Sequence, residues 1–103
     1  MKIAFSVYGV PIRLTQERMA HIVKGHPELD KMEAEILQVI NAPDIVQQGD
    51  SGALLAVKKF GKTPVTENKY LVVAYKELSE TDGFVLTAYY SSELKRRSEL
   101  WKN

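Results

Sequence analysis

Apolar residues recur at the spacing of one helical face in the first part of the chain. The members of this stripe are Met19, Ile22, Val23 and His26. Thr15 precedes them, and its hydroxyl can accept a hydrogen bond from a free amide of a first turn, so we predict a helix over about 16–24. Gly25 suits the left-handed position after a helix, and Pro27 prevents simple continuation.

A second apolar stripe predicts a second helix over about 31–41. Its broad apolar side consists of Met32, Ile36, Leu37, Val39 and Ile40. The run Asn41-Ala42-Pro43-Asp44 ends this helix. Ahead of both helices, residues 2–7 can form a short strand, which the run Gly9-Val10-Pro11 then breaks.

The second half of the chain has patterns typical of strands. Strands are predicted over 45–48, 53–60, 69–78 and 84–91, the last two rich in Val, Tyr, Phe and Thr. Turns are expected at 49–52 and at the hairpin tip 81–83, and a polar loop over 61–68. Residues 93–101 predict a short closing helix at the C-terminus, anchored by Leu94 and Trp101. Helices followed by consecutive strands favour an α+β fold in one domain, residues 1–103, with helices on one face of an antiparallel sheet.

Composition sets the broad class of the protein. A chain of 103 residues suits one small domain, and 45% apolar with 26% charged residues is an ordinary globular mixture. No apolar run reaches the roughly 18 residues that a membrane span needs, and the first residues lack the long apolar stretch of a signal peptide. With no cysteine, the sequence offers neither a disulfide nor a thiolate metal site, and a cytoplasmic location is expected.

Positive and negative charges nearly balance over the whole chain, but they are distributed unevenly between its two halves. The formal net charge is +1; residues 1–50 hold five Lys/Arg and seven Asp/Glu, whereas residues 51–103 hold nine and six. The positive second half gives weak support to a local basic groove of the kind that a nuclease needs.

His21 and His26 are the natural candidates for acid–base chemistry near neutral pH. His26 shares the apolar stripe, so its simpler role is to close the helix, where a protonated imidazole suits the negative end of the helix dipole. His21 lies off that stripe, nearer Glu17 and Arg18, and is expected to be more exposed. A spacing of five is poor for two metal ligands on one helix, because residues three or four apart are the neighbours. No metal site and no other cofactor is expected.

The stretch from Gly83 to Arg97 gathers hydroxyls and cations. Alternation along this strand separates two sets of side chains: Val85, Thr87 and Tyr89 on one face, and Phe84, Leu86, Ala88 and Tyr90 on the other. The second set looks core-facing, which leaves Thr87 and Tyr89 on an open face. Lys76 shares its parity with Tyr70 on the preceding strand, and only the register decides which parity is open.

A phosphate is the ligand that this stretch suits. The basic run Lys95-Arg96-Arg97 can neutralise a scissile phosphate, and Thr or Tyr hydroxyls can position it. The alternative is that the tyrosines are ordinary strand residues and that the basic run is a solvated helix face.

Four motifs carry a resemblance to a known group of proteins. They are LTQERMAHIVKGHPEL, ILQVINAPDIV, KYLVVAYKE and GFVLTAYYSSELKRR, in this order and over about residues 12–101. Together they resemble the phage-type barnase–EndoU–colicin–RelE-like (BECR) nuclease group. That group has a first helix of the HI-x-x-x-HPE type, a helix ending in PD, a strand of the LVVVYKE type and a strand ending in T-x-Y-Y. Ser91 departs from the pattern, since threonine is usual after the tyrosine pair, but the hydroxyl is kept.

The resemblance implies N-terminal helices packed on a four-stranded antiparallel sheet. It also implies a metal-independent ribonuclease, often a toxin or a phage-associated module. The positions that match the family's motifs are His21, His26, Glu28, Lys76, Glu77, Thr87 and Tyr90.

The chemistry expected of such a protein is attack of an RNA 2′-hydroxyl on the adjacent phosphate, which needs no metal because the nucleophile belongs to the RNA. The expected catalytic residues are His21, His26, Lys76, Thr87 and Tyr90. The expected substrate-binding residues are Glu28, Lys95, Arg96 and Arg97. Within these sets we expect His21 to be the general base or acid, and Lys76 or Arg96 to stabilise the charge on the phosphate. Thr87 and Tyr90 would hold its non-bridging oxygens.

The expected partner is RNA, either tRNA or ribosome-bound mRNA, and no membrane. A toxin also implies a cognate antitoxin or immunity protein that covers the open face of the sheet. The alternative is a catalytically inactive relative that binds RNA or a protein. Steep loss of affinity with rising salt would indicate the RNA binder.

Overall fold

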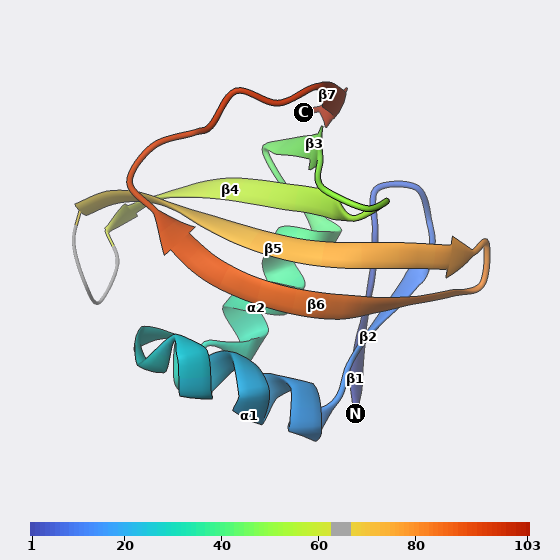
Figure 1. The fold of residues 1–103 in the computed structure, drawn as a ribbon, viewed down its shortest axis with the longest axis horizontal. Helices are drawn as coiled ribbons and strands as arrows, with labels where there is room; N and C mark the ends of the chain where they lie inside the picture. The colour runs from blue at the N-terminus through green and yellow to red at the C-terminus, as the bar shows by residue number, and fades with distance from the viewer. Residues whose placement is uncertain (63–66) are drawn as a thin grey trace.

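One mixed β-sheet with two α-helices against it makes up the computed structural model, which describes residues 1–62 and 67–103 (Figure 1). Its strands lie in the order β1-β2-β6-β5-β4-β3-β7. The elements along the chain are β1 (Lys2–Phe5), β2 (Pro11–Leu14), α1 (Gln16–Gly25), the 3-10 turn η1 (Pro27–Leu29), α2 (Glu33–Asn41), β3 (Ile45–Gln48), β4 (Leu54–Lys62), β5 (Glu67–Ser79), β6 (Asp82–Ser91) and β7 (Glu99–Lys102).

The fold is α+β, but the predicted four-stranded antiparallel sheet is wrong. The described residues form a seven-stranded sheet, and β2 runs parallel to β6 through the pairs Ile12↔Gly83 and Arg13↔Phe84. β2 is hidden in the sequence because Pro11 lacks an amide donor and Gly9 lies two residues before it, which together indicate a break. Gly9 instead has φ +81° and turns the chain back, so that β2 pairs antiparallel to β1.

The predicted closing helix over 93–101 is also wrong. Residues 92–98 form neither helix nor strand, and β7 follows them with Trp101 opposite Val46 on β3. The open edge of β3 offers the backbone of β7 hydrogen-bond partners, whereas a short isolated helix is only marginally stable. The 92–98 segment therefore connects the end of β6 to the far edge of the sheet as an irregular chain (Figure 1).

Both predicted helices are confirmed to within about two residues. α1 begins after Thr15, whose hydroxyl accepts from the amide of Arg18 at 3.0 Å. Gly25 lies inside α1, so the predicted left-handed glycine is wrong, and the amide of His26 closes the helix on the carbonyl of Ile22. β3 has the predicted bounds. β4 and β5 extend into the predicted polar loop, of which residues 63–66 lie outside the described residues.

The helices define two faces of the sheet. α2 lies behind the sheet in Figure 1 and α1 runs beside β6, so we call the covered side the helix face and the opposite side, over which no described helix lies, the outer face. The helix face holds the main core, which includes Ile22, Leu29, Ile36, Val39, Ile12, Leu14, Leu71, Val73, Tyr75, Val85 and Ala88. The outer face holds a smaller cluster of Ile45, Leu55, Val57, Val72 and Ala74, bordered by Tyr70, Leu86 and Tyr89.

A β-bulge in β6 changes which side chains share a face. Ala74 pairs with Thr87 while Tyr75 pairs with Val85, so Leu86 is an extra residue in β6. The strict alternation predicted for this strand therefore fails at Leu86. Val85 lies on the helix face with Ala88 and Tyr90, whereas Leu86 joins Thr87 and Tyr89 on the outer face.

None of the helices in the described residues is long and apolar enough to span a membrane.

Gly83 permits the close approach of β2 to β6, and an alanine there should be costly. A methyl group at this position would stand 2.5 Å from both Ile12 Cδ1 and the Lys76 carbonyl oxygen, the second of which is fixed backbone. We expect Gly83→Ala to lower the free energy of unfolding by about 1–3 kcal/mol in urea denaturation. Gly25→Ala is the matched control, since a methyl there meets nothing within 4 Å and helical alanine is favoured. Equal stability of both variants and the parent would contradict this account.

Candidate functional site

α1 lies along an edge of β6 beside which the described residues place no strand. β2 pairs with β6 only at Gly83 and Phe84, and the rest of that edge faces α1 (Figure 1). Arg18 Nη1 donates to the carbonyl of Leu86, the bulge residue, at 3.2 Å. This bond holds the helix against the strand, and so brings the end of α1 to the end of β6.

His26 lies where α1 ends beside Tyr89. The ring centroids of His26 and Tyr89 are 6.1 Å apart, with 34° between the ring planes. Pro27 then starts η1, which returns the chain and brings Glu28 Oε2 to 3.8 Å from His26 Nδ1. Both side chains are partly exposed, 39% for His26 and 29% for Glu28. The carboxylate therefore stands beside Nδ1, where it can orient the ring.

Tyr90 lies on the other side of β6 from Tyr89, packed against the helix-face core. Burial raises the pKa of the Tyr90 hydroxyl, and the carboxylates of Glu35 and Glu28 raise this pKa further. Tyr90 is thus a neutral hydroxyl near Glu28 at neutral pH, and it does not share the outer face.

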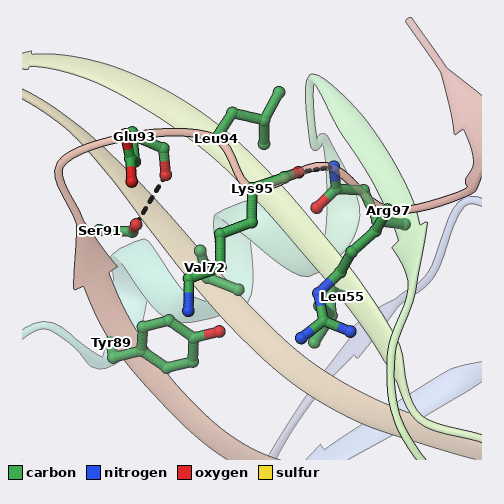
Figure 2. Close-up of a pocket in the computed structure, with 9 residues that line it drawn as sticks. Leu55, Val72, Tyr89, Ser91, Glu93, Leu94, Lys95 and Arg97 are labelled. Atoms are coloured by element: carbon green, nitrogen blue, oxygen red, sulfur yellow. Dashed lines mark hydrogen bonds between the residues drawn. The ribbon is translucent and has the colours of Figure 1, made fainter.

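A small hollow lies between the outer face of the sheet and the 92–98 segment. Figure 2 shows the side chains of Lys95 and Arg97 reaching from that segment toward the sheet, on the side of Tyr89. The hollow is lined by Gln47, Leu55, Val72, Tyr89, Ser91, Glu93, Leu94, Lys95 and Arg97. It measures about 20 Å³, which suits a water molecule. Tyr89 lines this hollow and also contacts His26, so its ring lies between the imidazole and the two cations, Lys95 and Arg97.

Backbone carbonyls hold the 92–98 segment in place. The buried amide of Gln47 donates to the Lys95 carbonyl at 3.0 Å, and the backbone amide of Gln48 donates to the Ser98 carbonyl at 2.9 Å. Ser91 Oγ donates to the Glu93 carbonyl at 2.7 Å (Figure 2). Arg97 Nη1 lies 3.6 Å from Asp50, a carboxylate that is 90% exposed and therefore a weak partner.

The structure brings together four of the predicted residues: His26, Glu28, Lys95 and Arg97. Arg96 is exposed and lines a second, more open hollow along the 92–98 segment, which shares Gln47, Lys95 and Arg97 with the first. Thr87 lies on the outer face between Tyr89 and Phe84.

The remaining predicted residues lie elsewhere. His21 is exposed and lines a separate hollow with Thr15, Glu17 and Arg18, because five residues turn a helix so that two side chains point about 140° apart. Lys76 pairs with Phe84 and stands four residues along β5 from Val72, the partner of Tyr89, a separation of about 13 Å. Glu77, which also matched a motif, follows Lys76 on β5 and accepts a hydrogen bond of 2.6 Å from Ser6 Oγ.

Tyr89 is the residue that the predicted site omits. Alternation did place it on an open face, but the motif match selected its neighbour Tyr90. Within the part of the chain that the structure describes, no three His, Cys, Asp or Glu residues are grouped as a metal ion would require. The absence of a metal in the reaction stays a prediction.

Three comparisons with known proteins found no match. No family model matches the chain, no curated protein is detectably similar to it, and no solved structure matches its fold. The likeness to BECR nucleases therefore rests on the four sequence motifs and stays a prediction.

Gln47 should control how tightly the 92–98 segment is held. Gln47→Ala leaves the Lys95 carbonyl without its donor, which costs about 1 kcal/mol, so we expect trypsin to cleave after Lys95, Arg96 or Arg97 about fivefold faster. Gln48→Ala is the matched control, because its side chain is exposed and its backbone amide keeps the bond to Ser98. Equal cleavage of the two variants, at equal unfolding midpoints, would show that the Gln47 bond does not hold the segment.

Proposed function

We propose that this protein is a metal-independent ribonuclease whose acid–base residue is His26. The observation that carries the proposal is the position of Tyr89, which contacts the His26 ring and lines the hollow between Lys95 and Arg97. An imidazole, a hydroxyl and two cations at one end of β6 are the groups that cleavage of a phosphodiester requires.

The reaction is a transfer at phosphorus within the RNA. A base removes the proton of the 2′-hydroxyl, the 2′-oxygen forms a bond to phosphorus, and the bond to the 5′-oxygen breaks as that oxygen takes a proton. His26 serves one of these proton transfers, and the carboxylate of Glu28, 3.8 Å from Nδ1, orients its ring. Lys95 and Arg97 neutralise the phosphate oxygens, and Tyr89 donates a hydrogen bond to one of them.

His26 is a better candidate than His21 for physical reasons. The acid–base group has to reach the phosphate that the cations bind, and His21 points away from Lys95 and Arg97 with only Glu17 and Arg18 as charged neighbours in its hollow. Tyr90 acts indirectly, through the environment of Glu28, and Lys76 is too distant from Tyr89 to hold the same phosphate.

The size of the hollow favours a second candidate, an RNA- or protein-binding module without catalysis. A hollow of about 20 Å³ has no room for a phosphate until the 92–98 segment moves outward. The anchoring bonds of that segment go to backbone carbonyls and to the exposed Asp50, so among residues 1–62 and 67–103 such a movement breaks no buried ion pair.

The two histidines separate these candidates in one cleavage assay. With RNA as substrate and a chelator present, we expect His26→Ala to lower the cleavage rate by about 10²–10⁴-fold, the usual contribution of one general acid or base. His21→Ala is the matched control and should stay within about twofold of the parent. Loss of activity in His21→Ala with full activity in His26→Ala would overturn the assignment. A folded parent that binds RNA without cutting it would favour the binding module.

The biological role, the RNA substrate, the protein partner and the location in the cell stay predictions. The toxin or phage-associated role, the choice between tRNA and ribosome-bound mRNA, and a cognate antitoxin or immunity protein follow from the resemblance alone. The cytoplasmic location follows only from the absence of cysteine.

A further inference from the structure

A row of side chains crosses the outer face at the end of the sheet opposite the hollow. Ile3 on β1 pairs with Arg13 on β2, Arg13 with Phe84 on β6, and Phe84 with Lys76 on β5. Directly paired residues point to the same side of a sheet. These four side chains therefore lie on one surface, near the turn between β5 and β6 at the right of Figure 1, which the 92–98 segment does not cross.

Phe84 is a partly exposed aromatic ring in the middle of this row. From Phe84, the outer face continues along β6 through Leu86 and Thr87 to Tyr89 in the candidate site. Phe84 pairs with Lys76 and Tyr89 with Val72, so the two aromatic residues are separated by four positions of β5, or about 13 Å, which is more than one nucleotide and within the span of a short oligonucleotide.

The charges around this surface are complementary to a phosphate backbone. Lys76 has no carboxylate within ion-pair distance among the residues that the structure describes. Arg13 forms an ion pair with the nearby Asp82, donating hydrogen bonds of 2.9 and 3.2 Å to its two carboxylate oxygens. The charge of that carboxylate is therefore already neutralised. Lys95 and Arg97 stand at the other end of the same face. Aromatic rings on a surface with cations at both ends suit single-stranded nucleic acid, whose bases stack while its phosphates pair with Lys and Arg.

We propose that the outer face of β6 and β5 is a platform for single-stranded RNA, with a base stacked on Phe84 and a phosphate on Lys76. This inference rests on the proposed ribonuclease function and assigns a second contact region to its substrate. A strand bound here passes from Phe84 along β6 to Tyr89, and so enters the hollow with its phosphate toward Lys95 and Arg97.

The test uses a 2′-O-methylated hexauridylate, which the enzyme cannot cut because the nucleophile is blocked. Phe84→Leu keeps the apolar bulk and removes the ring, so we expect the dissociation constant to rise about tenfold, and Phe84→Tyr to restore binding. Phe60→Leu makes the same change on the helix face and should alter binding by less than twofold. Lys76→Gln should reduce the steepness of log K against log salt by about 0.7, while Lys24→Gln on α1 should not change it.

The outcomes separate this proposal from the proposed function. Equal affinity of Phe84→Leu and the parent, both folded, would overturn the platform, and so would a parent that binds no hexauridylate. Cleavage of a dinucleotide, which is too short to reach Phe84, tests the candidate site alone. A parent that cuts neither dinucleotide nor RNA but loses hexauridylate affinity in Phe84→Leu would remove the ribonuclease and leave the platform.

Discussion

A strand edge without a partner leaves backbone amides and carbonyls open to other chains, and β6 has such an edge beyond Phe84. α1 covers this edge, and Arg18 satisfies the carbonyl of Leu86. Because the helix is fixed there, its closing residue His26 arrives at the end of β6 rather than in solvent. The short turn η1 then needs only three residues to return Glu28 to the imidazole. The acid–base half of the candidate site follows from the way one strand edge is protected.

Features that depend on neighbouring residues could be predicted from the sequence. The cap at Thr15 and the apolar stripe determined the bounds of α1, and β3 could be predicted because it lies between the end of the second helix and a clear turn at 49–52. β2 and β7 could not be found in this way. Each is only four residues long and is stabilised by a partner far along the chain, β6 for Arg13 and β3 for Trp101. Short segments of this kind become strands through tertiary pairing, which overrides local propensity.

The same division applies to the candidate site. His26 and Glu28 lie two residues apart, so their proximity follows from local sequence once Pro27 starts a turn. Which of Tyr89 and Tyr90 belongs to the site does not follow from local sequence, because it depends on how the residues of β6 pair with those of β5. The contribution of Lys95 and Arg97 likewise required the path of the 92–98 segment, for which a helix was predicted. The sequence favours His21 as the acid–base residue, because it lies off the apolar stripe. In the structure, the turn of α1 directs His21 away from β6.

The extra residue at Leu86 also determines where this strand can gain or lose length during evolution. Removal of Leu86 would leave Val85 opposite Tyr75 and Thr87 opposite Ala74, so every side chain on either side would keep its face. Removal of Thr87 would have the same effect, because Thr87 shares the outer face with Leu86. Removal of any interior residue of β6 outside this pair would turn one part of the strand over and exchange the environments of Tyr89 and Tyr90, or of Val85 and Phe84. A distant relative with a regular strand is therefore expected to carry a one-residue gap at position 86 or 87. An alignment that puts the gap elsewhere would match a core residue to a surface residue.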